Sequence, residues 1–180
     1  MPKARRTIPP TKYLHECFIY NPETGALGWK QRPLPHFVTT RAWKKWNTRY
    51  AGKAAGVINK NGYWLIRIND EGYLSHRVIW KMITGKEPPL ILDHKDGNPA
   101  NNCLSNLRAA TPLQQQWNKR LPKTNTSGFR GVVRNRSKWQ AQIKINGVCH
   151  YRGIFDTPEE ASAVYETAAR ELHGEFYRQG

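Results

Sequence analysis

The sequence predicts an α+β fold arranged in two domains. Short runs of β-prone residues, separated by Gly, Asn and Pro turns, alternate with a few amphipathic segments of helical period. Two helix starts carry the same signal, a Thr-Pro pair with Gln or Glu three residues after the threonine, at Thr111 and Thr157. The polar, Pro-containing stretch 120–128 has no apolar pattern and is typical of a linker. We therefore expect domains at 1–124 and 125–180.

The charge balance points to a polyanionic partner. The chain has 180 residues, and its 29 Lys and Arg against 13 Asp and Glu leave a net charge of +16. Solubility alone does not require such an excess, and nucleic acid is the simplest partner. The alternatives are a solvated basic surface or a small ribosomal-type protein that binds RNA. Hydrophobic residues make up 38% of the chain, which is enough for a globular core and argues against a disordered basic tail.

The cysteines and the N-terminal segment favour a protein of the cell interior. Cys17, Cys103 and Cys149 lack the paired spacing of a zinc knuckle or a disulfide framework, so we expect reduced thiols that pack. No apolar run approaches membrane-spanning length, and the start MPKARRTIPP lacks the apolar stretch of a secretory signal. We expect no membrane partner and a cytoplasmic location.

The N-terminal third is expected to hold one hairpin followed by a loop. The turn residues of 21–25 lie between two β-prone pairs, Phe18-Ile19 and Leu27 with Trp29. Residues 31–50 are rich in Arg, Lys and Trp without clean periodicity, and we expect a loop there. Its tryptophans, among them Trp43 and Trp46, either pack the loop down or lie against DNA, and packing is the more common role.

A second hairpin and a helix follow. The β-prone run 63–68 and the run 73–75 flank a turn, Asn69-Asp70-Glu71-Gly72. We expect Ser75 to cap a helix over about 76–84, with Gly85 as its terminator. Leu90-Ile91-Leu92 is expected to form a short apolar strand.

The segment after this strand concentrates imidazole and amide groups. The strand runs into Asp93-His94, so adjacent side chains stand at its end, where one can bind a metal while the other faces a water. Asn106 lies twelve residues after His94. The helix that Thr111 caps has Gln115 in its first turn, projecting back toward the strand end.

These residues resemble the HNH homing-endonuclease family of phage type. Asp93-His94, Asn106-Leu107-Arg108 and the Thr-Pro helix start occur in the family's order, and upstream residues match its preceding hairpin and helix. Those upstream residues are Gly62-Tyr63, His76-Arg77, Trp80 and Gly85. The resemblance implies a ββα-metal nuclease core over about 90–120.

The resemblance also implies roles for individual side chains. His94 would be the general base that deprotonates water, Asn106 would orient its imidazole, and Asp93 would bind a divalent metal. The family usually supplies a second metal-binding Asn or His nine residues after Asn106, where this chain has Gln115; Asn118, one helical turn later, is the fallback ligand. Oxygen ligands without thiolates favour Mg²⁺ or Mn²⁺.

The C-terminal part predicts a three-stranded antiparallel sheet covered by one helix. Asn146-Gly147 between β-prone runs is a strong hairpin signal. In the run before it, Trp139, Ala141, Ile143 and Ile145 alternate with polar and basic residues, so one face packs and the other is exposed. The helix after Thr157 supplies the covering stripe: Ala161, Val164, Tyr165, Ala168 and Leu172.

This part is similar to the ethylene-response-factor (AP-two/ERF) DNA-binding domain. The similarity lies in Arg130-Gly131-Val132, Gly153-Ile154-Phe155 and the Glu-Glu-Ala helix opening, although Arg152 stands where that family usually has an apolar residue. The exposed face of the sheet would enter the major groove of double-stranded DNA. The expected DNA contacts are Arg130, Arg134, Arg136, Gln142, Lys144 and Tyr151 from this domain, with Arg77, Lys119 and Arg120 outside it.

Taken together, the sequence predicts a monomeric endonuclease that nicks or cleaves double-stranded DNA inside the host cell of a phage or mobile element. The Arg- and Lys-rich N-terminal part would add phosphate contacts. Because Gln115 departs from the family pattern, a DNA-binding regulator with an inactive HNH unit is the alternative. An RNA-binding structural protein is disfavoured by the groove-reading sheet and the nuclease spacing.

Overall fold

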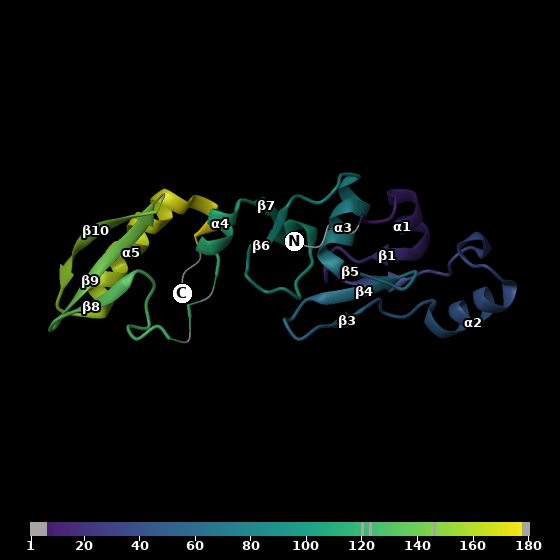
Figure 1. The fold of residues 1–180 in the computed structure, drawn as a ribbon, viewed down its shortest axis with the longest axis horizontal. Helices are drawn as coiled ribbons and strands as arrows, with labels where there is room; N and C mark the ends of the chain where they lie inside the picture. The colour runs from purple at the N-terminus through teal and green to yellow at the C-terminus, as the bar shows by residue number, and fades with distance from the viewer. Residues whose placement is uncertain (1–6, 120, 123, 146, 178–180) are drawn as a thin grey trace, which may run out of the picture. The chain divides into compact units, whose positions relative to one another are not determined.

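The computed structural model describes residues 7–119, 121–122, 124–145 and 147–177, with only the backbone of Ile145. The chain has a mixed fold of helices and small sheets, as predicted (Figure 1). It divides into two compact units, Met1–Ala110 and Thr111–Gly180. The domain boundary near residue 124 stays a prediction. No described helix is long and apolar enough to cross a membrane.

The first unit alternates short helices with hairpins. Its regular elements are α1 (Thr11–Cys17), β1 (Phe18–Tyr20), β2 (Leu27–Trp29), a 3-10 turn (Leu34–His36), α2 (Thr40–Tyr50), β3 (Val57–Ile58), β4 (Trp64–Ile68), β5 (Glu71–Leu74), α3 (Ser75–Thr84), β6 (Ile91–His94), a 3-10 turn (Leu104–Asn106) and β7 (Leu107–Ala110). β1 pairs with β2 and β6 with β7, while β3, β4 and β5 form an antiparallel sheet in chain order. The three hairpins around 21–25, 69–70 and 95–106 thus join strands adjacent in the sequence.

The core of the first unit lies where α1 and α3 pack together against the strands. Its most deeply buried side chains come from α1, β1, β4 and α3: Leu14, Cys17, Phe18, Ile66, Ile68, Val78 and Ile79. Val78, Ile79 and Met82 recur at the three- and four-residue spacing of one helix face. The remaining face of α3 turns away from this core and carries His76 toward β6.

Two local expectations for this unit are wrong. Residues 31–50 do not form a continuous loop, because α2 occupies Thr40–Tyr50 and is capped by the Thr39 hydroxyl, which accepts from the Ala42 N–H at 3.1 Å. Ser75 does not cap α3: it is the first helical residue, its buried hydroxyl has no hydrogen-bond partner among the described residues, and Leu74 stands at the N-cap. Gly85 does end α3, in the left-handed conformation at φ +70°.

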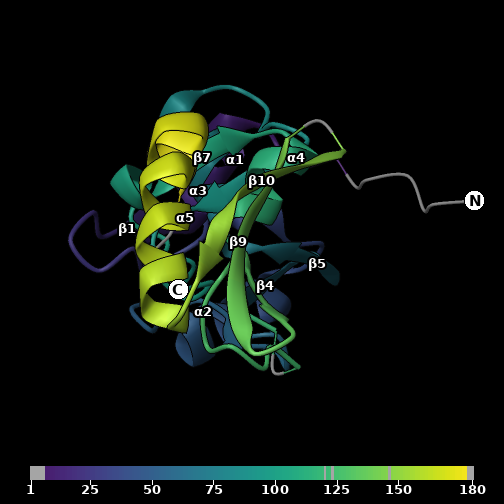
Figure 2. The ribbon, with the colours of Figure 1, turned by 90° about the vertical axis from the view of Figure 1, so that its left-hand side faces the viewer.

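The second unit is a sheet with one helix on its face. It contains α4 (Pro112–Trp117), β8 (Val132–Asn135), β9 (Lys138–Ile145), β10 (Val148–Phe155), α5 (Pro158–His173) and a 3-10 turn (Gly174–Phe176). The three strands form an antiparallel sheet in the order β10-β9-β8, and α5 covers one face of it (Figure 2). Both α4 and α5 begin with the predicted capping box.

The register of this sheet explains the position of Arg152. Tyr151 pairs with Gln142 and Gly153 with Ala141, so Arg152 is an extra residue in β10 opposite the continuous strand β9. A bulge accommodates a charged side chain where regular pairing would turn an apolar one inward. The helix stripe is as predicted except at its end, where Leu172 is exposed and Ala169 is buried instead. The predicted turn residue Asn146 lies outside the described residues.

Candidate active site

Two short strands place the candidate catalytic residues at one end of the β6/β7 hairpin. Asp93 pairs with Arg108 and His94 with Leu107, the last pair before the chain opens into the loop 95–106. Successive side chains of a strand point to opposite faces, so those of Asp93 and His94 lie in different surroundings although the two residues are adjacent in the chain. Both side chains are buried, Asp93 at 7% and His94 at 5% exposure.

Asn106 closes the loop that follows His94. Its side-chain oxygen accepts from the Asp96 N–H at 3.1 Å, and its amide nitrogen donates to Asp96 Oδ1 and to the Asn101 carbonyl, both at 2.9 Å. Asn101 in turn donates to Asp96 Oδ2 at 2.7 Å. These bonds join the two ends of the loop, so Asn106 fixes the shape of the chain after His94.

Asp96 is the acceptor at the centre of this loop. Partial burial by itself would raise the pKa of its carboxyl group, but hydrogen bonds from the Asn98 N–H, Asn106 and Asn101 together lower that pKa below its usual range. The carboxylate is therefore ionised at neutral pH and holds its three donors. The turn at Asp96 therefore orders the loop beside His94.

The imidazole of His94 contacts an amide that the sequence argument did not single out. His94 Nε2 lies 3.1 Å from Asn102 Oδ1, and Asn102 is almost completely buried. An amide oxygen accepts, so this contact favours a proton on Nε2 of His94. Asn106, the predicted orienting residue, makes its side-chain bonds to Asp96 and Asn101; a direct role toward His94 stays a prediction. In the sequence, this contact was indicated only by the two consecutive asparagines, Asn101 and Asn102.

A second histidine lies edge-on to His94. The rings of His76 and His94 are 5.0 Å apart at 74°, and the Tyr63 ring lies 6.0 Å from that of His94. Burial lowers the pKa of His76 to about 3, and the neighbouring His94 and Arg77 contribute in the same direction. His76 is therefore neutral at physiological pH and places no positive charge beside His94.

The carboxylate of Asp93 is held by the facing strand. Arg108 Nε and Nη2 both lie 3.1 Å from Asp93 Oδ2 across the β6/β7 pair. A buried charge without a partner is costly, and the pairing of Asp93 with Arg108 supplies each of these buried groups with an oppositely charged partner. In the sequence Arg108 stood out only as part of the Asn-Leu-Arg motif, and in the structure it pairs with Asp93.

Gly25 connects the first hairpin to the loop that carries Asn102. It has φ +68°, and a Cβ built on it would lie 2.4 Å from the Cys103 backbone nitrogen and 2.5 Å from the Asn102 carbonyl carbon. Backbone atoms cannot move aside as a flexible side chain can. The turn after β1 thus packs directly on the segment that supports His94.

We expect Gly25→Ala to destabilise the protein by about 2 kcal/mol or more, because it combines a left-handed backbone with overpacking against backbone. Gly52→Ala is the matched control: Gly52 has φ +77° but no atom within 4 Å of an added Cβ, so only the backbone strain of about 1 kcal/mol applies. Chemical denaturation followed by tryptophan fluorescence measures both. Equal losses in the two variants would show that the close approach to Asn102 has no energetic weight.

The other predicted metal ligands belong to the second unit. Gln115 is half-buried in α4, and Asn118 is buried directly after that helix. Thr111 caps α4 as predicted, with its hydroxyl accepting from the Gln114 N–H at 3.2 Å and Gln114 Oε1 accepting from the Thr111 N–H at 2.8 Å. The cap sets where the helix begins and hence where Gln115 stands on it.

The exposed face of the second unit's sheet is polar. Ala141 and Ile143 of β9 are buried against α5, so Gln142 and Lys144 project from the opposite face. Tyr151 pairs with Gln142 on that face and is 57% exposed. Amide groups form a row across it, with Asn135 donating to Gln140 at 2.9 Å and Gln140 to Gln142 at 3.4 Å.

The predicted cationic contacts fall into different surroundings. Arg134 pairs with Trp139, so it lies on the face that α5 covers, with its guanidinium 4.9 Å from the Trp139 ring. Arg136 and Lys119 are exposed. Arg130 donates to the Trp117 and Lys119 carbonyls after α4, and in the first unit Arg77 donates to the carbonyls of Pro88 and Pro89. These two arginines have internal roles, and their contact with DNA stays a prediction. Arg120 lies outside the described residues.

Comparison with known proteins identifies the region around this hairpin. A family profile described as HNH endonuclease matches residues 73–116. The chain is 39% identical to Protein 3.8 of Escherichia phage T7 over 106 residues, which cover 57% of this chain and 87% of that protein. The chain belongs to the HNH endonuclease family. The matched HNH domain runs from β5 to α4 and includes Asp93, His94 and Asn106.

Two further relatives match parts of this chain. It is 41% identical over 103 residues to a protein named "Uncharacterized HNH endonuclease L560" of Acanthamoeba polyphaga mimivirus, across 56% of this chain and 54% of that one. It is 44% identical over 59 residues to "Ethylene-responsive transcription factor ERF084" of Arabidopsis thaliana, across 31% of this chain and 23% of that one. No solved structure matches the chain. The HNH resemblance is confirmed, the ethylene-response-factor resemblance is partial, and the homing type stays a prediction.

The HNH domain offers oxygen ligands of the kind that a hard divalent cation binds. Asp93 and Gln115 lie within the matched residues, the first with a carboxylate and the second with an amide oxygen, and Asn118 follows two residues after the match. Within the part of the chain that the structure describes, no three His, Cys, Asp or Glu side chains gather into a metal cluster. Carboxylate and amide oxygens are the donors that Mg²⁺ and Mn²⁺ prefer, whereas structural zinc sites use thiolates and imidazoles.

Proposed function

We propose that this chain is a metal-dependent endonuclease that nicks or cleaves double-stranded DNA. The observation that carries the proposal is the Asp93-His94 pair at the end of β6 inside the HNH endonuclease match. A buried carboxyl group and an imidazole on adjacent residues supply the two groups that phosphodiester hydrolysis needs, a metal ligand and a base. The net charge of +16 is in keeping with a DNA substrate.

In the proposed mechanism His94 takes the proton from the attacking water. The Asn102 oxygen next to Nε2 favours the tautomer whose lone pair is on Nδ1, so Nδ1 is the atom that receives the proton. Neutral His76 beside it avoids a charge that would oppose protonation of His94. Asn106 and Asp96 hold the loop in the shape that presents this ring.

Asp93 is the proposed metal ligand on the hairpin, with Gln115 or Asn118 as a second. A divalent ion bound there would stabilise negative charge on the scissile phosphate and on the leaving 3′ oxygen. Arg108 orients the Asp93 carboxylate through Oδ2. These residues together form the proposed ββα-metal centre. The products should carry 5′-phosphate and 3′-hydroxyl ends.

The direct test uses supercoiled plasmid. The full chain should convert it to nicked circles with Mg²⁺ or Mn²⁺ and leave it intact with EDTA, and DNA ligase should reseal the nicks without prior phosphorylation. One set of hydrolytic groups makes nicking by a monomer the expected reaction. If duplex DNA binds but neither metal supports nicking, the regulator with an inactive HNH unit becomes the better reading. The similarity of this chain to a phage T7 protein supports action inside a host cell.

We propose that the sheet of the second unit reads the DNA sequence. The half-buried row Asn135, Gln140 and Gln142 offers amides that can pair with adenine, while the exposed Lys144 and Tyr151 flank it. The partial similarity to a protein named as an ethylene-responsive transcription factor supports this assignment. Affinity for phosphates would come from Lys and Arg elsewhere, including Lys119 and Arg136.

Gln142→Ala should lower sequence selectivity by about 10-fold, because a good bidentate amide–base contact discriminates by about 1–3 kcal/mol. Sites are first selected from a random duplex library with the parent protein, and the ratio of affinities for selected and scrambled duplexes is then measured. Gln31→Ala, the same substitution at an exposed position of the first unit, should leave the ratio unchanged. An unchanged ratio in Gln142→Ala would remove Gln142 from base recognition.

A further inference from the structure

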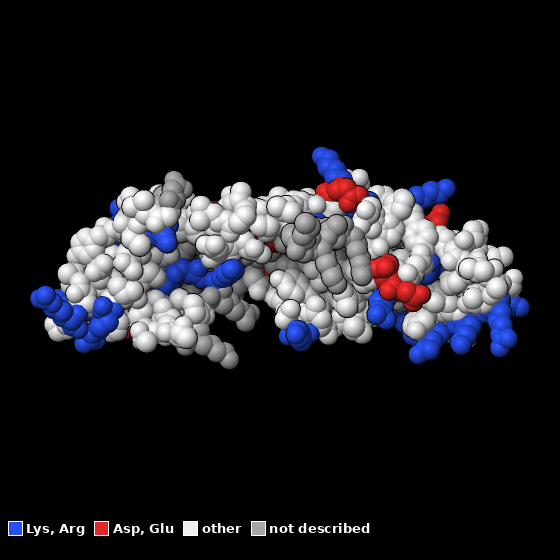
Figure 3. Space-filling model, in the orientation of Figure 1, with Lys and Arg blue, Asp and Glu red and all other residues white. Residues whose placement is uncertain are grey.

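The helix α2 presents a face made of cations. Arg41, Lys44, Lys45 and Arg49 are all exposed, and their spacing of three and four residues puts them on one side of the helix. Figure 3 shows Lys and Arg side chains gathered at lower right, over α2. The opposite side of the helix packs on the core of the first unit through Trp46 and Tyr50.

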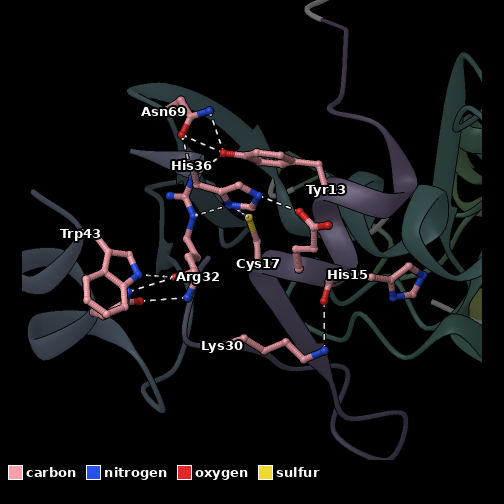
Figure 4. Close-up of polar contacts among 10 residues, drawn as sticks. Tyr13, His15, Cys17, Lys30, Arg32, His36, Trp43 and Asn69 are labelled. Atoms are coloured by element: carbon pink, nitrogen blue, oxygen red, sulfur yellow. Dashed lines mark hydrogen bonds and ion pairs between the residues drawn. The ribbon is translucent and has the colours of Figure 1, made fainter. Parts of the chain in front are cut away.

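The segment before α2 anchors the helix rigidly. The Arg32 carbonyl accepts from Trp43 Nε1 at 2.8 Å and from Asn47 Nδ2 at 3.0 Å, and Asn47 Oδ1 accepts from the Arg32 N–H at 2.9 Å (Figure 4). Trp43, for which the sequence allowed either packing or contact with DNA, thus forms a hydrogen bond inside the first unit. The cationic face of α2 is consequently held in one orientation.

The guanidinium of Arg32 also helps to hold the segment before α2 in place. It is only 3% exposed, lies 4.9 Å from the Trp46 ring, and donates to the Tyr13 hydroxyl and to Asn69 Oδ1 (Figure 4). The partners lie on α1 and after β4, so α2 is tied to two other parts of the unit. Arg32 serves the interior, whereas the four cations of α2 point outward.

The stretch of sequence that contains these four cations has no acidic residue. Residues 24–69 include no Asp or Glu, but they include Lys30, Arg32, Arg41, Lys44, Lys45, Arg49, Lys53, Lys60 and Arg67. Arg41 with Lys45, and Lys45 with Arg49, are like-charge pairs four residues apart, which destabilise a helix. A face kept for solubility would mix both signs. An unmixed cationic face of this kind is typical of a surface that binds an external anion.

We infer that α2 is a second DNA-binding surface, which holds the phosphate backbone of duplex DNA without reading its sequence. This inference rests on the proposed function, because it takes the same duplex as partner. Lys and Arg bind phosphate, and the one amide in the helix, Asn47, is used by Arg32. Eleven residues span about 16 Å, enough to contact several phosphates of one duplex. Affinity then comes from α2 and selectivity from the sheet of the second unit.

The test compares two double variants of the full chain that lose the same charge. Lys44→Gln with Lys45→Gln neutralises α2, and Lys12→Gln with Lys86→Gln neutralises two exposed lysines outside α2. Binding to a fluorescent duplex is measured by anisotropy in EDTA over a range of KCl concentrations. The α2 variant should bind about 10-fold more weakly or worse at low salt, and its slope of log K against log salt should be shallower by about 1.8, for two lost phosphate contacts. The loss should be equal for a second duplex of scrambled sequence.

Three results would overturn the inference: unchanged duplex binding by the α2 variant, an equal loss in both double variants, or a loss confined to structured RNA. Plasmid nicking by the parent protein is measured separately with metal. A salt effect in the α2 variant without nicking by the parent would remove the nuclease proposal and keep the α2 surface. Nicking by the parent without a salt effect in the α2 variant would remove the α2 surface and keep the nuclease proposal.

Discussion

His94→Ala should abolish nicking of supercoiled plasmid while leaving duplex affinity nearly unchanged. A positioned general base contributes about 10²–10⁴-fold to a rate, and the neighbouring imidazole of His76 is a poor substitute, because it is buried with its pKa lowered to about 3. A neutral imidazole adds little to phosphate binding, so affinity in EDTA should stay within about 2-fold. Plasmid nicking in Mg²⁺ and anisotropy in EDTA measure the two quantities on the same preparation.

The control is His15→Ala, which removes an exposed histidine on α1. It should nick at the parental rate. Cleavage at the parental rate by His94→Ala would remove His94 from the mechanism. A fall in both nicking and the free energy of unfolding would instead show that His94 acts through packing beside Asn102 and Tyr63.

Elements with strong local signals were predictable from the sequence. The hairpin β1/β2 follows from the turn around Asn21, whose side-chain oxygen accepts from the Glu23 and Thr24 N–H groups. The helices α4 and α5 follow from their Thr-Pro capping boxes. In each case residues within three or four positions decide the conformation, so one stretch of sequence contains the whole signal.

Elements stabilised by distant partners were not predictable in this way. The stretch 31–50 has no apolar run, and α2 forms because Trp43, Trp46 and Asn47 find partners around Arg32 and Trp29. Ser75 was expected as a cap from its residue type alone, but the strand β5 continues to Leu74 and shifts the helix start. Tertiary packing overrides local propensity in both cases.

The candidate site shows the same division. The family's spacing identified Asp93, His94 and Asn106, and the first two lie at the predicted strand end. The contact of Asn102 with His94 and that of Arg108 with Asp93 depend on strand register and loop closure, which residue types do not disclose. Residue spacing predicts which groups belong to a site; their pairing depends on the fold.

Gln115→Ala should reduce metal-dependent nicking by about 10²-fold or more if Gln115 is the second metal ligand. The proposed ion depends on few protein groups, and the loss of one oxygen ligand removes a contribution of a few kcal/mol to the charged transition state. Gln115→Asn should preserve or raise activity, because it restores the shorter amide that the family uses. Nicking rates over a range of Mg²⁺ concentrations measure the effect, and the apparent metal affinity should weaken with the rate.

Gln116→Ala supplies the matched control, since Gln116 is the next residue of α4 and is exposed. It should nick like the parent protein. Duplex affinity in EDTA should barely change in any of these variants, because phosphate contacts elsewhere dominate it. Full activity in Gln115→Ala together with a collapse in Asn118→Ala would move the ligand one helical turn further along the chain. Asn118 is buried, so that collapse counts only if the free energy of unfolding of Asn118→Ala is close to that of the parent.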